Sequence, residues 1–308
     1  MSVVRPVIQG VSPVLPTPFR ADGSLDRRSF ERVSRHTWEL GVGSVMFPGF
    51  ASEYFALGDL ERLQLMADLA GTVPPGHLLI ASVAEHATCL ATRQVRRYAG
   101  LGAGAINVLP PHFGDPPRAM VLDHLSAVLE AAGPLPVVVQ FAPRDTGARL
   151  DPGDLAGLRA AHPNLAAVKV ECRSPGAYIR ALSERGVPCL AGNAGIDLPE
   201  ALEAGAVGVQ PGGGFVELYL RLLRLWQAGE HKAALALHAR LAARLESWWP
   251  VPGRPLAMGK AIAWRRGLID GPYCRAPGPT IPDGPGDPNL TEVDGFIRKF
   301  SLDSHDPR

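Results

Sequence analysis

The sequence predicts an α/β protein, a (β/α)8 TIM barrel with a C-terminal helical appendage. Two observations carry this prediction: apolar runs of strand length recur through the first 228 residues, and a helical pattern follows each of them. The runs are apolar throughout rather than alternating, which is typical of parallel strands buried on both faces. A doubly wound sheet is the main alternative, but no GxGxxG motif follows the first run and the count of eight favours the barrel.

The first predicted helix shows the pattern on which the element assignments rest. Phe30, Val33 and Thr37 recur at helical spacing and therefore share one face. Asp26 precedes them, where a side chain that caps a helix is expected. The eight runs that we expect to form strands span residues 10–19, 42–49, 77–84, 103–111, 135–143, 164–171, 187–193 and 206–214.

Beyond the eighth run, the sequence is typical of helices rather than of further strands. An Ala- and Leu-rich segment opens this part, and the helical patterns cover residues 230–247, 255–267 and 291–300. We therefore expect residues 1–228 to form the catalytic barrel. Residues 229–308 are expected to form a helical extension packed on that barrel.

Composition excludes several classes of function. The chain has 308 residues, of which 46% are hydrophobic and 20% charged, and its formal net charge is +1. Neither nucleic acid nor an anionic membrane is therefore suggested as a partner, and no apolar run approaches the roughly 20 residues of a membrane span. The first residues lack the pattern of a signal peptide. No CxxC pair occurs, so we interpret the cysteines as buried thiols of a cytoplasmic protein: Cys89, Cys172, Cys189 and Cys274.

One lysine stands out against this composition. Only four of the 31 basic residues are lysines, and Lys169 is the one that lies in an apolar run, "NLAAVKVE". A buried ammonium costs several kcal/mol, roughly, unless it is paired or loses its proton. Unlike arginine, a lysine can become a neutral nucleophile that forms an imine with a ketone. The alternative is a structural lysine whose amine reaches past the strand end to an acid at the surface.

In a TIM barrel, catalytic side chains project from the C-terminal ends of the strands. The glycines at 212–214 allow three interpretations: a phosphate-binding loop, room for a substrate, or a tight turn. The sequence contains no set of His, Asp and Glu residues at the spacing of metal ligands, so no metal site is predicted. The other polar residues expected at the strand ends are Ser52, Glu53, His112, Gln140, Glu171 and Asn193.

These motifs resemble those of the dihydrodipicolinate synthase / N-acetylneuraminate lyase family over about residues 7–300. "PVLPTPF" is similar to the P-x-x-TP start of that family, and "VKVE" to its lysine strand. The resemblance implies a Schiff-base TIM barrel in which Lys169 forms the imine. It also implies a small 2-keto acid substrate, no cofactor besides the covalent imine, no metal, and assembly as a homotetramer (dimer of dimers) or homodimer.

The chain departs from the family pattern at four places. The GTTGE turn that holds the substrate carboxylate is "GFASE" here, at residues 49–53, so both threonine hydroxyls are missing. Gln140 replaces the tyrosine that relays protons in the family, and a glutamine does not titrate near neutral pH. The tyrosine contributed by a neighbouring subunit is also missing, and His112 lies nearest its position. The family arginine is displaced, since Asp145 stands in its place beside Arg144.

A subgroup of the family, the L-2-keto-3-deoxyarabonate dehydratases, resembles the chain at these diverged positions. The shared features are the Ser-Glu turn, "VQFAPRDTG" with Gln140, "KVE" and "GGG". The resemblance implies dehydration of a 2-keto-3-deoxy sugar acid, with Lys169 and Gln140 as the catalytic residues. Two roles stay open for Glu171, a proton relay or a structural hydrogen bond, and the structural hydrogen bond is favoured for it and for Glu53. The residues expected to bind the substrate are Ala51, Ser52, His112, Asn193 and Gly213.

Two other functions remain open from the sequence. A pyruvate-dependent aldolase, or a condensation of the dihydrodipicolinate synthase type, uses the same imine and enamine. A barrel that binds a keto acid without turning it over is the alternative from a different class, because both family tyrosines are absent.

Overall fold

The computed structural model describes residues 8–143, 149–279, 281 and 287–302. The chain divides into two compact units that interleave along the sequence. The first comprises Met1–Ser12, Gly43–Phe47 and Gly76–Gln210, and the second comprises Pro13–Val42, Pro48–Pro75 and Pro211–Arg308. The domain boundary expected after residue 228 stays a prediction.

The first unit contains the sheet. Within the described residues, eight parallel strands pair in the order β1-β8-β7-β6-β5-β4-β3-β2. Every strand lies inside one of the eight apolar runs, so the predicted strands are confirmed, although each is shorter than its run. Their bounds are β1 Gly10–Val11, β2 Ser44–Phe47, β3 Leu78–Val83, β4 Ala105–Val108, β5 Val137–Phe141, β6 Leu165–Val170, β7 Cys189–Ala191 and β8 Gly208–Val209.

Hydrogen bonds bring the two ends of this strand order together. Ser44, in β2, donates its hydroxyl proton to the Oγ of Ser12, which follows β1, at 2.8 Å. Gln210, just after β8, donates from Nε2 to the same Oγ atom at 3.2 Å. All three side chains are buried. The sheet therefore curls back on itself, and the fold is a (β/α)8 TIM barrel, as predicted.

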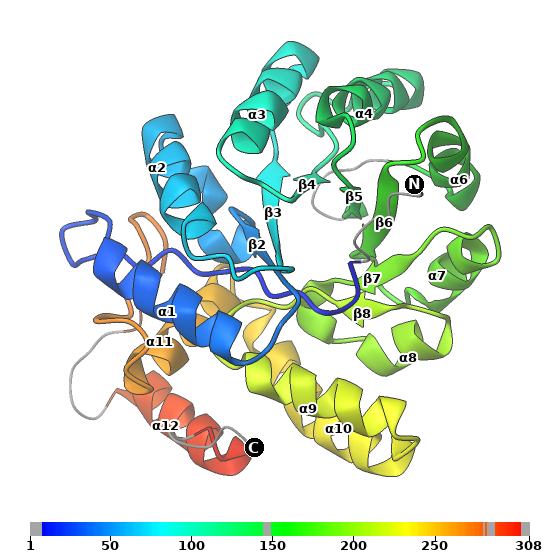
Figure 1. The fold of residues 1–308 in the computed structure, drawn as a ribbon. Helices are drawn as coiled ribbons and strands as arrows, with labels where there is room; N and C mark the ends of the chain where they lie inside the picture. The colour runs from blue at the N-terminus through cyan, green and yellow to red at the C-terminus, as the bar shows by residue number, and fades with distance from the viewer. Residues whose placement is uncertain (1–7, 144–148, 280, 282–286, 303–308) are drawn as a thin grey trace. The chain divides into compact units, whose positions relative to one another are not determined.

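The helices of the first unit follow one another around the outside of strands β3 to β8 (Figure 1). The helix that begins at Pro152 has a capped N-terminus, because Asp151 accepts the N–H of Asp154 at 2.9 Å and Pro152 occupies the first turn. These helices are α3 Thr88–Gly100, α4 Arg118–Ala132, α6 Pro152–Ala161, α7 Gly176–Ser183 and α8 Leu198–Glu203, and the short 3-10 turn η3 spans Asn193–Gly195.

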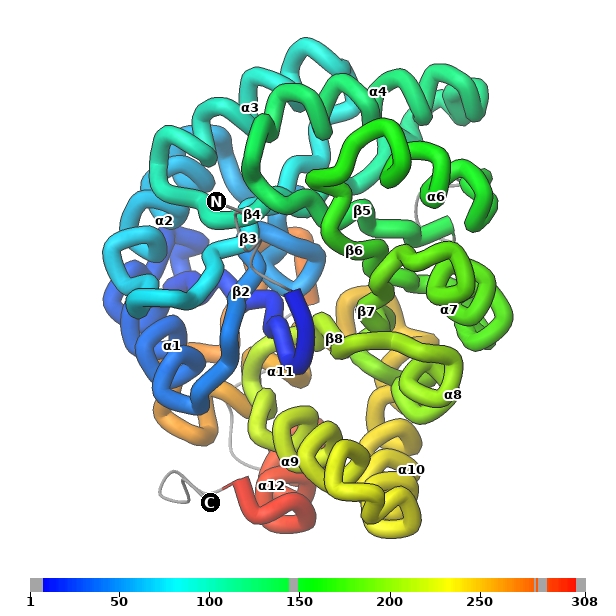
Figure 2. The backbone as a smooth tube through the Cα atoms, turned by 45° about the vertical axis from the view of Figure 1, so that its right-hand side comes forward, coloured from blue at the N-terminus to red at the C-terminus, as the bar shows by residue number. Residues whose placement is uncertain are grey.

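The second unit is helical. Asp26 caps its first helix by accepting the N–H of Ser29 at 3.1 Å, which confirms the predicted cap. In Figure 2, α9 and α10 run side by side, and α11 packs against α12. The three helices expected after residue 229 are thus confirmed. The elements are α1 Arg27–Glu39, η1 Phe50–Ser52, η2 Tyr54–Ala56, α2 Asp59–Ala70, α9 Val216–Gln227, α10 His231–Trp248, α11 Arg254–Arg265 and α12 Pro288–Phe300.

An aromatic cluster joins the helices of the second unit. The ring of Phe215, at the start of α9, lies 5.2 Å from that of Phe296 in α12 and 6.5 Å from that of Trp248 in α10. Trp248 and Phe296 are themselves 5.5 Å apart, and all three are buried. Such aromatic pairs contribute roughly 0.5–1.5 kcal/mol each beyond their buried area, so the C-terminal helices share one core.

The cysteines correct one expectation. Cys189 and Cys274 are buried, but Cys172 is only half-buried and Cys89 is exposed on α3, so the interpretation of all four as buried thiols is wrong. Thr88 begins α3, and the side chain of Cys89 points away from the buried face that Ala91 and Val95 form. Across the part of the chain that the structure describes, no helix is both long enough and apolar enough to cross a membrane.

Candidate active site

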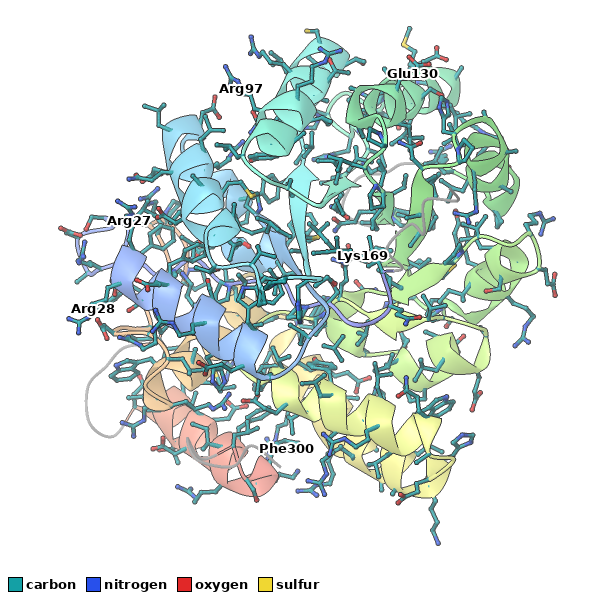
Figure 3. The ribbon with its side chains drawn as sticks, viewed as in Figure 1. Arg27, Arg28, Arg97, Glu130, Lys169 and Phe300 are labelled. Atoms are coloured by element: carbon teal, nitrogen blue, oxygen red, sulfur yellow. The ribbon has the colours of Figure 1, made fainter. Side chains whose placement is uncertain are left out.

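Lys169 is buried inside the first unit. Its side chain is 4% exposed, and its Nζ lies 3.1 Å from Oε1 of Glu171. Figure 3 shows Lys169 among the strands, whereas Arg97 and Glu130 lie on the surrounding helices. Its amine meets a buried carboxylate two residues further along the chain. The structure therefore excludes the alternative in which the lysine reaches a surface acid.

Glu171 is held in place from several sides. Gln140 donates from Nε2 to Oε2 of Glu171 at 2.5 Å, and the backbone N–H of Asn193 donates to Oε1 at 3.2 Å. The carboxylate also forms an ion pair with Lys169. Glu171 is 7% exposed, so these partners replace the water that an ionised carboxylate needs. The arrangement is a buried carboxylate in contact with a buried amine.

Strand register explains why these side chains meet. Gln140 in β5 and Lys169 in β6 are register partners in neighbouring parallel strands. Side chains at positions i and i+2 of an extended chain point to the same side, so Glu171 lies on the side of Lys169. The backbone N–H of Glu171 still bonds to Phe141 at 2.8 Å, which keeps it in line with the sheet. The K-x-E spacing thus forms the pair.

Two further polar residues extend this network, and sequence reasoning missed both. Asn107, in β4, donates from Nδ2 to Oε1 of Gln140 and to the Oγ of Ser82 in β3, each at 2.9 Å. Both are buried, and Asn107 is 0% exposed. An asparagine inside the apolar run "AINV" is as unusual as the lysine in "AAVKV", and that was the signal available in the sequence.

His112 lies beside a second histidine after the strand ends. Its ring is 4.4 Å from the ring of His86, and its Nδ1 lies 3.3 Å from the carbonyl oxygen of Pro110. His86 follows β3 and accepts the backbone N–H of Phe113 on its Nδ1 at 3.3 Å. Partial burial, and then the neighbouring His112, hold the pKa of His86 below its usual value. Sequence reasoning had not singled out His86.

The turn at residues 49–53 belongs to the second unit. Groups of that unit hydrogen-bond to both the side chain and the backbone of Ser52. The Ser52 hydroxyl donates to the carbonyl of Leu15 at 2.5 Å and accepts the N–H of Gly49 at 2.9 Å. Its backbone N–H bonds to Gly49 O at 2.9 Å, and its carbonyl accepts from Thr17 at 2.6 Å. In this conformation Ser52 therefore organises the turn, and its hydroxyl proton is already used.

Ala51 and Gly213 lie in the same unit. Ala51 is half-buried in η1, and a Cβ added to Gly212 would be 3.4 Å from its methyl group. The N–H of Gly213 donates to the carbonyl of Val14 at 2.9 Å, and a Cβ on Gly213 would lie 2.8 Å from Pro16. The glycine segment thus packs tightly against residues 14–16. This contact requires glycine at 213 without any bound ligand.

A second buried lysine, Lys260 in α11, is bonded to groups that hold the fold together. Its Nζ donates to Oε1 of Glu53 and, at 2.8 Å, to the carbonyl of Tyr273. Glu53 also accepts the backbone N–H of Arg275 at 2.9 Å. Burial lowers the pKa of Lys260, and the Glu53 carboxylate opposes that shift. The pair anchors the turn at residues 49–53 to α11 within the second unit.

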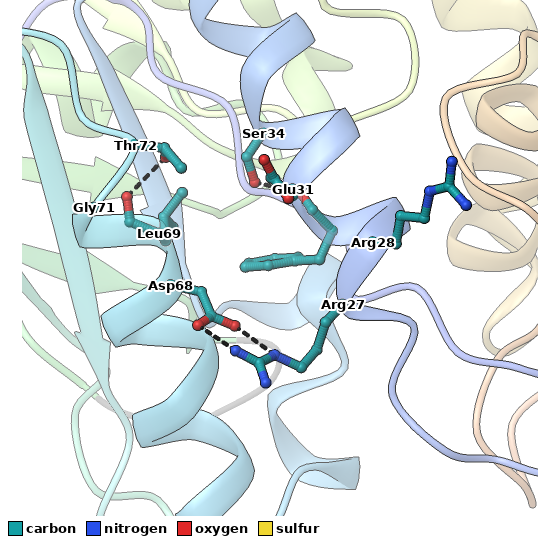
Figure 4. Close-up of a pocket in the computed structure, with 9 residues that line it drawn as sticks. Arg27, Arg28, Glu31, Ser34, Asp68, Leu69, Gly71 and Thr72 are labelled. Atoms are coloured by element: carbon teal, nitrogen blue, oxygen red, sulfur yellow. Dashed lines mark hydrogen bonds and ion pairs between the residues drawn. The ribbon is translucent and has the colours of Figure 1, made fainter.

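A cavity of about 480 Å³ lies between α1 and α2 (Figure 4). Two of the residues that line it, Arg27 and Asp68, are joined by two hydrogen bonds from the guanidinium of Arg27, at 2.6 and 2.8 Å. None of the predicted site residues is among the residues that line it. Within the described residues, no group of three or more His, Cys, Asp or Glu side chains is placed to hold a metal ion. Arg144 and Asp145 lie outside the described residues.

The fold and this network together define a class, a TIM barrel with a buried lysine–carboxylate pair at the end of its sixth strand. The chain belongs to the dihydrodipicolinate synthetase family, which it matches over residues 7–283. This is a family of lyases, and both synthases and a dehydratase occur among the relatives.

Two relatives and one solved structure illustrate the match. The 4-hydroxy-tetrahydrodipicolinate synthase of Xanthomonas campestris pv. campestris is 32% identical over 270 residues, covering 86% of this chain and 87% of that one. The L-2-keto-3-deoxyarabonate dehydratase of Azospirillum brasilense is 28% identical over 289 residues, 89% of each chain. The crystal structure of dihydrodipicolinate synthase from Rhodopseudomonas palustris superposes with a TM-score of 0.86 at 22% identity, over 96% of this chain and 99% of that chain.

Proposed function

We propose that the protein is a Schiff-base-forming lyase that dehydrates a 2-keto-3-deoxy sugar acid, of the L-2-keto-3-deoxyarabonate type, through an imine on Lys169. The observation that carries the proposal is the buried contact of 3.1 Å between Lys169 Nζ and Glu171. A lysine in this setting has a carboxylate at hand to take its proton, and the resulting neutral amine is a nucleophile.

The reaction proceeds in four balanced steps. The amine of Lys169 adds to the C2 carbonyl, and the carbonyl oxygen leaves as water to give a C2=N imine. The protonated imine draws electrons from C3, so a C3–H proton leaves and an enamine forms. The enamine electrons then break the C4–O bond, and the hydroxyl leaves with a proton as a second water. Hydrolysis of the imine consumes one water and frees Lys169, so the substrate loses one water overall.

Each proton transfer in these reaction steps needs a group that carries the proton. We assign that role to Glu171. It touches the amine that becomes the imine nitrogen, and it is bonded to Gln140 at 2.5 Å. Gln140 cannot carry a proton itself, so it positions Glu171 and offers a hydrogen bond to the substrate or to a water. General acid–base catalysis of this kind contributes about 10²–10⁴-fold in rate.

The remaining site residues keep the roles that the resemblance implies. We assign His112 and Asn193 to the distal hydroxyls of the substrate, and Ala51, Ser52 and Gly213 to its carboxylate. The side-chain proton of Ser52 is donated to Leu15, so the carboxylate role assigned to Ser52 requires its turn to rearrange or falls to backbone amides. These contacts stay predictions, as do assembly into a homotetramer or homodimer and residence in the cytoplasm.

One residue, Gln140, favours dehydration over condensation as the reaction. The relatives include both a 4-hydroxy-tetrahydrodipicolinate synthase and an L-2-keto-3-deoxyarabonate dehydratase. Gln140 stands where the synthase pattern has a titratable tyrosine, and its amide bonds to both Asn107 and Glu171. A β-elimination needs no second substrate, so it requires only the imine and a proton carrier.

Borohydride trapping tests the proposal. The protein is incubated with pyruvate or with 2-keto-3-deoxy-L-arabonate, reduced, digested and mapped by mass spectrometry. We expect the adduct on Lys169 and none in Lys169→Ala, with the exposed Lys232→Ala as the matched control. An adduct on Lys260 alone, or on no lysine, would contradict the imine mechanism.

Turnover assays distinguish the alternatives. Release of water from 2-keto-3-deoxy-L-arabonate supports the dehydratase. Carbon–carbon bond formation from pyruvate and an aldehyde, without dehydration, indicates an aldolase or a condensing enzyme instead. A protein that binds these acids but turns none of them over, with or without Lys169, would be a keto-acid-binding barrel.

A further inference from the structure

We propose that Asn107 is a positioning residue that fixes the direction of the Gln140 amide, so that Gln140 donates to Glu171 and leaves it a proton acceptor beside Lys169. The inference rests on the proposed function, and it adds a residue that neither the family motifs nor the lysine strand indicated. Asn107 acts through Gln140 and does not touch Lys169.

The direction of the hydrogen bonds carries the argument. A glutamine side chain has one accepting and one donating end, and either end can face Glu171 if nothing selects between them. Here Oε1 of Gln140 accepts from Asn107 at 2.9 Å, so Nε2 is left to donate to Glu171 at 2.5 Å. Asn107 Nδ2 also donates to the Oγ of Ser82 at 2.9 Å, so the same amide nitrogen bonds to both neighbours.

The opposite direction of the Gln140 amide would disable the carboxylate. Oε1 of Gln140 would then face Oε2 of Glu171, and two acceptors repel each other unless a proton lies between them. Glu171 would hold that proton and lose its capacity to accept one from Lys169. Gln140 and Asn107 are both buried, so water is a poor substitute for either partner.

The network keeps this direction at a cost. Within the described residues, the buried Oδ1 of Asn107 has no hydrogen-bond partner, whereas its Nδ2 uses both protons. Among the described residues, the polar partners of Glu171 are the Lys169 amine, the Gln140 amide and the backbone N–H of Asn193, and Lys169 is the titratable one among them.

A double-mutant cycle tests the proposal. Asn107→Leu, Gln140→Met and the double variant have similar shapes to the parent side chains but lack their hydrogen bonds. The readout is the rate at which C3 protons of pyruvate, and of 2-keto-3-deoxy-L-arabonate, exchange in D2O, followed by NMR across a range of pD. Ser44→Ala is the control, because Ser44 is equally buried and bonds to Ser12 rather than to this network.

We expect Asn107→Leu to slow exchange about tenfold, or by more, and to move the acidic limb of the pD profile upward. In the Gln140→Met background, the same Asn107 change should add less than about twofold, since its route to Glu171 is already lost. Ser44→Ala should match the parent protein. A full Asn107 effect in the Gln140→Met background, or a profile of Asn107→Leu that overlays the parent, would overturn the inference.

Two further observations keep the test decisive. If Asn107→Leu does not fold, Ser82→Ala replaces it, with a smaller shift expected in the same direction because Asn107 then loses one of its two acceptors. If the parent protein shows neither C3 exchange nor an adduct on Lys169, the proposed function fails. If the parent exchanges but the cycle shows independent effects, only the role of Asn107 fails.

Discussion

Gly192 lies so close to Glu171 that a Cβ added to it would be 2.1 Å from the Cγ of Glu171. Gly192 has φ of −101°, which any residue can adopt, so space rather than backbone conformation requires glycine here. We predict that Gly192→Ala displaces Glu171 and lowers turnover by about tenfold or more, since general acid–base catalysis depends on position. Gly157→Ala is the control, because nothing lies within 4 Å of a Cβ at that position. Equal turnover of both variants would show that Glu171 need not stay in place.

The carboxylate itself is tested by Glu171→Gln. We expect the rate constant for dehydration of 2-keto-3-deoxy-L-arabonate to fall by about 10²–10⁴-fold, because the glutamine cannot carry a proton. The borohydride adduct should still form on Lys169, more slowly. Stopped-flow or NMR turnover together with adduct mapping measures both effects, and a variant with full turnover would remove Glu171 from the mechanism.

Lys260 and Glu53 form a buried ion pair whose partners depend on each other. Lys260→Met leaves the carboxylate without its main cation, which costs about 3–5 kcal/mol of unfolding free energy. The double variant Lys260→Met with Glu53→Gln should recover part of that loss. Urea unfolding followed by circular dichroism measures both, with the exposed Lys232→Met as control. Purely additive losses in the double variant would mean that the two side chains do not stabilise each other.

Glu217 makes stability depend on acidity. Burial alone would raise its pKa, but hydrogen bonds from His36 and Arg266 outweigh burial and lower the pKa to about 2. Its contribution is complete above its unfolded pKa, near 4.5, and is lost as the pH falls toward 2. At neutral pH it is worth about 3 kcal/mol at most.

We predict that Glu217→Gln lowers stability at neutral pH and flattens the loss of stability between about pH 4.5 and 2. Thermal unfolding at a series of pH values measures this, and the exposed Glu246→Gln serves as the control. Parallel curves for the parent protein and Glu217→Gln across that window would contradict the assignment.

Apolar patterning was sufficient to predict all eight strands, because parallel strands buried on both faces must be apolar throughout. It overestimated their lengths most at β1 and β8, which pair over only two residues. Residues 10–19 include three prolines, which cannot donate to a ladder, so the apolar run continues where the pairing has stopped. The apolar composition of a segment indicates that it is buried. The length of the strand within that segment depends on which residues form hydrogen bonds to a neighbouring strand.

The site was predictable where it depends on spacing within one strand. Lys169 and Glu171 are two residues apart, so their contact follows from alternation alone. Asn107, Ser82 and Gly192 were missed because their roles depend on which residues of neighbouring strands and turns lie opposite one another. Ser52 shows the reverse case, since its hydroxyl matched a motif but is used by Leu15 within the fold.

The pairing of β1 with β8 also has a consequence for the order in which the chain folds. Gly10 and Gly208 are register partners, so the first strand of the barrel cannot find its neighbour until residue 208 has left the ribosome. Strands β2 to β7 pair with one another in chain order, so all of their residues have been synthesised before that point. During synthesis the nascent chain therefore carries an open sheet edge for most of its length, and contacts so distant in sequence are slow to form. Of all the contacts in this sheet, the β1–β8 pairing is the one that most exposes the growing polypeptide to misassembly.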